Sequence, residues 1–292
     1  MKSKHSLVDY LKIPPRYLVD KLLLLASSPF GKKFARYFFG LIRFPHDVRI
    51  HLGKDTIHVN TWDRFIVVFL SKLSLLENTE SKILKDEIKE GMTVLDVGAN
   101  IGVYTLKVAN LVGPTGRVWA FEPDQNNYSS LTKNVNTNRY GNVTLINKAV
   151  ADKTGTSRLF ISEENRGDHR IFSSDEQRIS VPIEIVALDD IFLREKIDFI
   201  KMDIQGAEYL ALTGMSELIQ RNRDIVILIE FAPNWLKDGG SSGQQLLDKI
   251  IDLGFPLKYV DDKTGQIRSI DKTSLLDSCK GNKYCTLYLK KQ

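Results

Sequence analysis

Cysteine is scarce in this sequence, and the N-terminal region lacks a long hydrophobic run. The two cysteines, Cys279 and Cys285, form no metal-ligand pattern and no disulfide framework, so we expect reduced thiols packed near a C-terminal strand. The longest charge-free run of the first 45 residues, from Leu22 to Gly31, is ten residues long and contains Pro29. Such a run is too short to span a bilayer, and its apolar core is too short for a signal peptide. These absences predict a cytoplasmic globular protein.

Positive charge is concentrated at the N-terminus. Residues 1–43 contain nine Lys or Arg and two Asp, a net charge of +7 within a chain total of +5, so the remainder carries about −2. This near-neutral body argues against a nucleic-acid partner. The interleaved basic and aromatic residues of 1–45 allow peripheral contact with an anionic membrane surface, which would place the protein there. We prefer the alternative, in which a pair of helices covers the following domain with its apolar faces.

The apolar pattern predicts a hairpin followed by a long α/β domain. Alternation over 48–52 and 56–60 predicts the hairpin, and 79–90 has the spacing of a helix. From residue 93 onward, short β-branched runs alternate with helical segments, which indicates a mostly parallel sheet. The predicted strands are 93–97, 117–121, 143–147, 199–202 and 225–231, and the predicted helices are 103–112, 126–138, 207–221 and 242–253.

An insertion and a C-terminal strand pair complete this pattern. Segments 156–161 and 180–187 have strand patterns and flank a polar loop between the third and fourth main strands. Two more strands are predicted at 257–260 and 284–289. The last strand has no room before it for a crossover, so we expect it to be antiparallel.

The stretch from Val94 to Gly102 carries the strongest functional signal. An apolar strand ends in Gly98-Ala-Asn-Ile-Gly102, and helical spacing resumes directly afterwards. A strand, a glycine turn and a helix bring bare backbone and a helix N-terminus close to a ligand at the carboxyl edge of a sheet. Asn100 replaces the second glycine of the dinucleotide fingerprint, which argues against a diphosphate. Asp96 favours a cationic or amine-bearing ligand instead.

A second acidic residue follows the next predicted strand. Glu122 lies 20 residues after Gly102, where an acid accepts hydrogen bonds from both hydroxyls of a ribose. Asp96, the glycine turn and Glu122 together predict a site for a nucleoside with a positively charged tail, and S-adenosylmethionine has this structure. The alternative is an ordinary α/β turn followed by a helix-capping acid.

These motifs resemble those of the FkbM-type methyltransferases, which use S-adenosylmethionine. The resemblance extends from about Val48 to the C-terminus. It implies a Rossmann-like class I methyltransferase fold, with a mostly parallel sheet and a final antiparallel strand, and O-methylation of a sugar or natural-product hydroxyl. The cofactor-binding residues that we expect are Glu77, Asp96, Gly98, Ala99, Asn100, Gly102, Glu122, Pro123, Asn147, Ala149 and Asp203.

We therefore expect three parts in the chain. These are a basic helical arm (1–46), a lead-in of a hairpin and a helix (47–91), and a catalytic domain that binds S-adenosylmethionine (92–292, with the β insertion at 156–187).

One residue departs from the family pattern. The family usually has Ile-Lys-Ile-Asp-x-Glu-Gly-x-Glu after the fourth strand, whereas Gln205 stands here in place of the first glutamate. An amide forms hydrogen bonds but takes up no proton and neutralises a cation poorly. We therefore predict no metal; Asp203 and Glu208 are weak evidence for one because two carboxylates five residues apart lack further acids.

An alcohol acceptor needs a base that takes its proton as attack proceeds. His169 is our first choice because its intrinsic pKa suits proton transfer near neutrality. Asp203 is the second choice and Glu230 the third, because they end the fourth and fifth predicted strands. Each has a structural alternative: a solvated loop histidine, a helix cap at Asp203, and an ion pair of Glu230 with Lys201 or Arg170.

The preferred function is thus O-methylation of a hydroxyl on a glycan or secondary metabolite. An N-methyltransferase would not need a strong base. A catalytically silent cofactor-binding protein, recruited through the basic arm, is an alternative of another class, and Gln205 favours it. A nicotinamide oxidoreductase is disfavoured by Asn100 and by the final antiparallel strand.

Overall fold

The computed structural model describes residues 48–59, 79–162, 169–172 and 178–291. The basic arm and Glu77 lie outside these residues. The chain divides into two compact units, one of Met1–Asn78 with Glu163–Gly167 and one of Thr79–Ser162 with Asp168–Gln292. None of the described helices is long and apolar enough to cross a membrane.

The described part of the first unit is the expected hairpin. Strand β1 (Val48–Leu52) pairs with β2 (Asp55–Val59) in antiparallel orientation, and Ile50 lies opposite Ile57. Both isoleucines are buried. Gly53 provides the positive φ of 62° at the turn between the strands.

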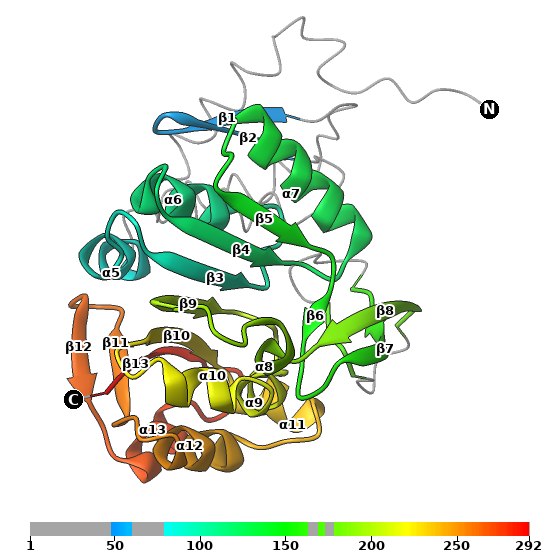
Figure 1. The fold of residues 1–292 in the computed structure, drawn as a ribbon. Coiled ribbons are helices and arrows are strands. Elements are labelled where there is room, and N and C mark those ends of the chain that lie inside the picture. The colour runs from blue at the N-terminus through cyan, green and yellow to red at the C-terminus, as the bar shows by residue number, and fades with distance from the viewer. Residues whose placement is uncertain (1–47, 60–78, 163–168, 173–177, 292) are drawn as a thin grey trace, which may run out of the picture. The chain divides into compact units, whose positions relative to one another are not determined.

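The second unit contains an eight-stranded sheet in the order β12-β11-β13-β10-β9-β3-β4-β5 (Figure 1). Its first five strands along the chain are parallel, and β13 is antiparallel to both β10 and β11. The predicted fold class and the antiparallel final strand are confirmed. The strands are β3 (Thr93–Val97), β4 (Arg117–Phe121), β5 (Val143–Ile146), β9 (Phe199–Met202), β10 (Val226–Phe231), β11 (Lys258–Asp261), β12 (Gln266–Ser269) and β13 (Cys285–Lys290).

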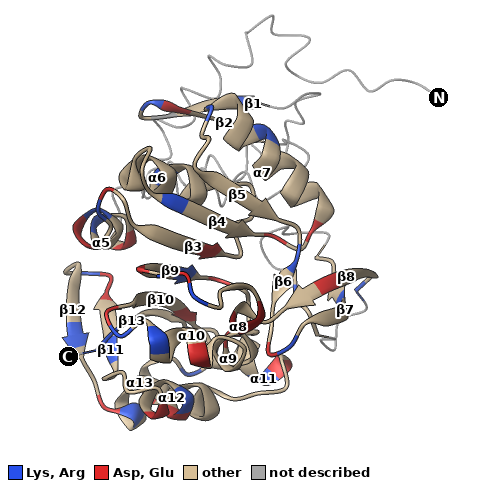
Figure 2. Cartoon of the chain, in the orientation of Figure 1, with Lys and Arg blue, Asp and Glu red and all other residues tan. Residues whose placement is uncertain are grey.

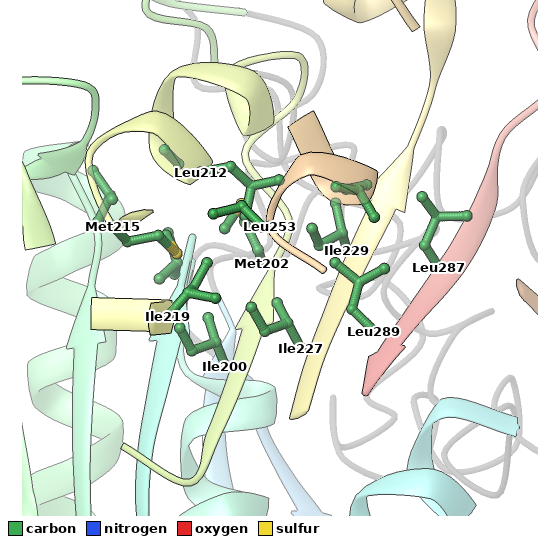
Figure 3. Packing of buried hydrophobic residues seen from close by; sticks show 14 of the residues in the cluster. Ile200, Met202, Leu212, Met215, Ile219, Ile227, Ile229, Leu253, Leu287 and Leu289 are labelled. Atoms are coloured by element: carbon green, nitrogen blue, oxygen red, sulfur yellow. The ribbon is translucent and has the colours of Figure 1, made fainter. Parts of the chain in front are cut away.

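Helices cover both faces of this sheet, which explains why its central strands are apolar throughout. One core joins the sheet to the C-terminal helices, with Ile200, Met202 and Ile227 packed against Leu212 and Ile219 (Figure 3). Another core lies under α5 and α6. The helices are α5 (Thr79–Glu87), α6 (Val103–Val112), α7 (Gln125–Thr137), α8 (Leu188–Ile191), α9 (Glu208–Thr213), α10 (Ser216–Arg221), α11 (Pro233–Asp238), α12 (Gly243–Asp252) and α13 (Lys272–Ser278).

The prediction of a single helix over 207–221 is wrong. It is divided into α9 and α10 at Gly214 and Met215. A Cβ atom on Gly214 would lie 2.0 Å from the carbonyl oxygen of Ala151, so only a glycine lets the backbone at Ala151 pack directly against this position. The Gly214 carbonyl accepts a hydrogen bond from the Asp189 amide, which ends the helical pattern through a tertiary contact.

The insertion forms a small sheet of its own. Strands β6 (Ala149–Val150), β7 (Gly155–Phe160) and β8 (Ser180–Val186) have the order β6-β8-β7, and β7 pairs with β8 in antiparallel orientation. The two predicted β segments are confirmed to within one residue, whereas β6 was not predicted. An isolated bridge between Phe160 and Arg170 extends β7.

Candidate functional site

The glycine turn after β3 presses against the loop after β9. Gly98 and Gly102 have φ values of 84° and 95°, and Asn100 has a φ of 52°. Asparagine tolerates this left-handed conformation better than most residues, so it can replace a glycine here. A Cβ on Gly98 would lie 2.1 Å from the carbonyl oxygen of Asp203. The turn therefore brings the ends of two parallel strands into backbone contact.

Glu122 connects this turn to the end of β4. Its Oε2 accepts a hydrogen bond from the Asn100 amide at 2.8 Å, and its Oε1 accepts one from the Asp124 amide at 2.9 Å. Burial raises the pKa of Glu122 to about 7, although these hydrogen bonds act in the opposite direction. Each carboxylate oxygen has a second lone pair, so the ribose role stays compatible with these contacts.

Asn147 and Ala149 follow β5, at the same edge of the main sheet. The Asn147 amide donates hydrogen bonds to the carbonyl oxygens of Glu122 at 2.8 Å and Pro123 at 3.1 Å. Ala149 is buried in β6. Asn147 thus fixes the backbone of the acidic turn, and its predicted position beside an adenine stays a prediction.

Asp96 lies inside the sheet beneath the turn. Its Oδ2 accepts a hydrogen bond from the Thr105 hydroxyl at 2.6 Å, whereas its Oδ1 is buried and has no hydrogen-bond partner in the described part of the chain. Burial raises the pKa of Asp96, and the nearby ammonium of Lys201 partly offsets this rise. An incoming donor would satisfy the second oxygen.

Lys201 is a buried cation that the sequence did not identify as part of the cofactor site. It lies directly opposite Asp96 in the register of β3 and β9, and its Nζ is 3.4 Å from Asp203 Oδ2 and 4.7 Å from the centre of the Tyr104 ring. Burial lowers the pKa of Lys201, but surrounding carboxylates, including Asp203, Asp96 and Glu80, raise it above its ordinary value overall. The lysine is therefore charged at neutral pH.

Glu80, in the first turn of α5, was also missed. Its two carboxylate oxygens accept hydrogen bonds from the Tyr104 hydroxyl at 2.5 Å and from the Thr286 hydroxyl at 2.7 Å. From the sequence we predicted Glu77 as the N-terminal acid of the site, and Glu77 lies outside the described residues. No motif marks Glu80, since only the fold brings α5, α6 and β13 together around it.

The departure at Gln205 has a clear structural consequence. Its amide nitrogen donates hydrogen bonds to Asp203 Oδ1 at 2.7 Å and to Glu230 Oε2 at 2.9 Å. Gln205 thus joins the two carboxylates that follow β9 and end β10. The charged residues of these central strands are coloured in Figure 2, with acidic segments on β3 and β10 and a basic segment on β9.

Glu208 is bonded to backbone amides. Its carboxylate accepts hydrogen bonds from the amides of Gly206 and Ile204 and so closes the loop at the start of α9. Burial raises its pKa to about 7. Within the described ranges, no three His, Cys, Asp or Glu residues are grouped to hold a metal ion.

His169 lies at the other end of the candidate site. Its Nδ1 accepts a hydrogen bond from the Ser162 amide at 3.0 Å, and its Nε2 is 4.0 Å from Asp124 Oδ2. Asp124 caps α7 through the amides of Asn126 and Asn127. The structure therefore brings His169 to the turn that follows Glu122.

Comparison with known proteins assigns this arrangement to a family. The model of the FkbM methyltransferase domain matches residues 96–257, which is more than half of the chain and includes the glycine turn, Glu122 and the acid pair. The chain belongs to the FkbM methyltransferase domain family. This is a domain of S-adenosylmethionine-dependent methyltransferases, as the sequence motifs predicted.

Individual relatives either match a shorter stretch of the chain or have low sequence identity to it. Over 60 residues the chain is 37% identical to protein-L-isoaspartate O-methyltransferase from Methanothrix thermoacetophila; this stretch is 20% of the chain and 29% of that relative. A SAM-dependent methyltransferase from Aquifex aeolicus superposes with a TM-score of 0.42 at 20% identity, covering 74% of this chain and 92% of that one. M. jannaschii TYW2 in complex with AdoMet gives 0.44 at 14% identity, covering 86% and 90%.

The residues present fit S-adenosylmethionine. The cofactor has a ribose, a cationic sulfonium and an amino-acid tail with both charges. Glu122 offers a buried acid for the ribose, and Asp96 has a buried oxygen that lacks a donor in the described part of the chain. Lys201 adds a buried cation that suits the carboxylate of the tail.

Proposed function

We propose that the whole protein is an O-methyltransferase that methylates a hydroxyl on a glycan or secondary metabolite. The observation that carries this proposal is the acid pair Asp203 and Glu230, which Gln205 joins at the carboxyl ends of two neighbouring parallel strands. Ligands of open α/β sheets bind at this edge. The pair offers carboxylate oxygens there that can accept a proton.

When bound, S-adenosylmethionine supplies an activated methyl group, so the protein has to orient the acceptor and take its proton. A hydroxyl is a poor nucleophile until a base accepts that proton. Lys201 stabilises Asp203 as an anion from 3.4 Å, and the Gln205 amide stabilises both carboxylates without adding charge. These contacts hold both carboxylates at the edge where the acceptor would bind.

We assign the proton to this pair. Asp203 accepts hydrogen bonds from the Lys201 ammonium and from Gln205, and Glu230 accepts one from the same amide. His169 stays the alternative base, although its contacts with Ser162 and Asp124 favour a role in holding the turn after Glu122.

The same residues suggest how the cofactor is held. Glu122 would accept hydrogen bonds from the ribose hydroxyls, while the Asn100 amide holds its carboxylate in place. Asp96 accepts from the ammonium of the amino-acid tail through its buried Oδ1. Lys201 would donate a hydrogen bond to the carboxylate of that tail. The positive lysine then lies against the negative end of the tail, and the negative aspartate lies against the positive end.

The test is transfer of a labelled methyl group from S-adenosylmethionine to a panel of sugars and hydroxylated aromatic compounds, each paired with its amine counterpart. We expect label in hydroxyl acceptors, and we expect Glu230→Gln to abolish transfer while S-adenosylhomocysteine still binds. Label only in the amines, with little effect of Glu230→Gln or His169→Gln, would establish the N-methyltransferase instead.

Calorimetric titration of S-adenosylhomocysteine into the wild type and Glu122→Ala accompanies this panel. We expect binding that is weakened in the variant, because the ribose loses its acceptor. Binding by the wild type without methylation of any acceptor would support the silent cofactor-binding protein, recruited through its basic arm.

The basic arm carries a separate proposal, peripheral contact with anionic membranes. Its nine Lys or Arg residues give an attraction to an anionic surface of about 1 kcal/mol for each residue that reaches it. Co-sedimentation with vesicles that contain phosphatidylserine should weaken when residues 1–45 are deleted. Equal sedimentation of both proteins would contradict the proposal.

A further inference from the structure

The two cysteines of the chain are in direct contact. Cys279 ends α13 as its C-cap, and Cys285 is the first residue of β13. Their sulfur atoms lie 3.4 Å apart, which is a hydrogen-bonding distance for sulfur. The sequence predicted reduced thiols packed near a C-terminal strand, and the contact between them is a relationship that only the fold reveals.

Both sulfurs are attached to anchored backbone. The Cys279 amide donates a hydrogen bond to the Leu275 carbonyl within α13, and Cys285 is paired with Phe231 at the end of β10. Only five residues connect the two cysteines. The backbone contacts on both sides therefore keep the two sulfur atoms close together.

We propose that Cys279 and Cys285 form a modification site at which a hydroperoxide converts the two thiols into an intramolecular disulfide. A disulfide has a sulfur–sulfur distance of about 2.05 Å, so the pair has to close by only ~1.4 Å. Two thiols alone do not make a metal site, and no third His, Cys, Asp or Glu completes one among the residues that the structure describes. Covalent closure is the chemistry left to such a pair.

The electrostatic surroundings divide the roles between the two sulfurs. The hydrogen bond between the two thiols lowers the pKa of Cys279 to about 7, and the nearby Lys283 acts in the same direction. The Cys279 anion, burial, and the carboxylates of Asp262 and Glu230 raise the pKa of Cys285. Cys279 is therefore the thiol that loses its proton more readily, and Cys285 is the one that keeps it.

The reaction balances in two steps. The Cys279 thiolate attacks the peroxide oxygen, forming a sulfenic acid and releasing hydroxide or alkoxide, which takes up a proton. Cys285 then attacks the oxidised sulfur, and water leaves with the proton of Cys285. The two electrons lost by the thiols reduce the O–O bond. Cys279 is almost fully buried and Cys285 is half-buried, so the oxidant approaches from the side of Cys285.

The bond would affect the acceptor side of the proposed active site. Cys285 precedes Thr286, which pairs with Glu230 across the sheet and donates a hydrogen bond to Glu80. Tyr284, on the other side of Cys285, stacks on Trp235 with ring centres 6.0 Å apart. A disulfide at this place fixes the segment that joins α13 to these residues.

The folded protein is treated with hydrogen peroxide, quenched with catalase, denatured, alkylated with iodoacetamide and weighed as an intact chain. We expect the wild type to lose two hydrogen atoms and to take up no alkyl group, and dithiothreitol before alkylation to restore two alkylation sites. Cys279→Ser and Cys285→Ser should each stay open to alkylation or gain oxygen atoms. Circular dichroism verifies that both variants are folded.

Two results would overturn the proposal. Wild type that still takes up two alkyl groups after treatment, under conditions in which free cysteine is fully oxidised, has no reactive pair. A disulfide that joins two chains, visible as a doubled mass, would show that the contact within one chain does not direct the reaction. The mass is measured without any acceptor or cofactor, so it is independent of the proposed function.

Discussion

The backbone amide of Asn100 donates a hydrogen bond of 2.8 Å to the carboxylate of Glu122. The two residues belong to different βα units and are joined because β3 and β4 are neighbours in register. The contact fixes the acid before any ligand arrives, which reduces the entropy that binding has to overcome. It also buries the carboxylate, and this burial has a measurable consequence for stability.

Burial of Glu122 makes the stability of the protein depend on pH. The pKa of this group is about 7 in the folded protein against an ordinary value of 4.5, so its ionised form is disfavoured by folding. The contribution of Glu122 to the free energy of unfolding is fully present below pH 4.5 and is lost as the pH rises through 7. This loss is at most about 3 kcal/mol. We expect Glu122→Gln to lose less stability than the wild type between pH 5 and about 8, measured by urea unfolding.

Glu208 also contributes to the pH dependence of stability, so this measurement needs a double variant and a control. Its pKa is also raised to about 7 by burial, so the single variant keeps part of the pH dependence and Glu122→Gln/Glu208→Gln should lose more of it. Glu217, whose side chain is 76% exposed, gives the matched control Glu217→Gln, with an unchanged pH dependence. Parallel curves for the wild type and Glu122→Gln would contradict the expectation.

The close approach of Gly98 to Asp203 predicts a large effect of one methyl group. In Gly98→Ala the new Cβ would meet a backbone oxygen at 2.1 Å, and the residue has a φ of 84°. We expect a loss of more than ~3 kcal/mol in unfolding free energy, from strain and displacement of the turn together. Thermal or urea unfolding measures it.

Gly240 separates these two causes. Its φ of 78° is similar, but no atom lies within 4 Å of an added Cβ. Gly240→Ala should therefore cost only the backbone strain, about 1 kcal/mol. Equal losses in the two alanine variants would show that the contact with Asp203 contributes nothing.

Local patterning was sufficient for the parts of the fold in which each element meets its neighbours regularly. Strands β3, β4 and β9 and helix α6 begin and end at the predicted residues, because short β-branched runs and helical spacing follow each other without overlap. The break between α9 and α10 was missed because it depends on the packing of Gly214 against Ala151. Helical spacing in the sequence continues through this break.

The candidate site was predictable where a motif carries it. Asp96, the glycine turn and Glu122 follow from residue types at strand ends. Lys201 and Glu80 were missed, because a strand that is buried on both sides has no polar alternation to mark its functional face, and α5 carries no motif. Only the folded arrangement brings Glu80 to the Tyr104 hydroxyl, and Lys201 to the Tyr104 ring and to Asp203.

Removal of the buried cation should weaken recognition of the amino-acid tail alone. In Lys201→Met we expect a loss of tenfold or more in affinity for S-adenosylhomocysteine, since a charged hydrogen bond contributes about 1.5–3 kcal/mol. Affinity for 5′-methylthioadenosine, which has the same nucleoside without the tail, should stay unchanged. Calorimetric titration of both ligands gives the comparison.

Unchanged binding of 5′-methylthioadenosine also verifies that the variant is folded. Lys196→Met is the matched control, because the same substitution there removes a lysine whose side chain is 75% exposed. It should leave the affinities of both ligands unaltered. An equal loss for both ligands in Lys201→Met would assign the lysine to the stability of the domain and not to the tail.

The bridge made by Gln205 predicts what the family residue would do at this position. In Gln205→Glu three carboxylates meet where the amide now donates to Asp203 and Glu230. Like charges at this distance are relieved by a shared proton or by a hard divalent cation with oxygen ligands. We therefore expect the variant to bind Mn²⁺, in a calorimetric or electron paramagnetic resonance titration, more tightly than the wild type does.

Gln205→Met is the control for this experiment, since it removes both hydrogen bonds and adds no charge. It keeps the unbranched side chain that the φ of 53° at this position requires. Mn²⁺ affinity should rise in the glutamate variant only and should fall again when Glu230→Gln is added. A rise in Gln205→Met as well would mean that loss of the amide bridge, and not the third carboxylate, exposes the acid pair to cations.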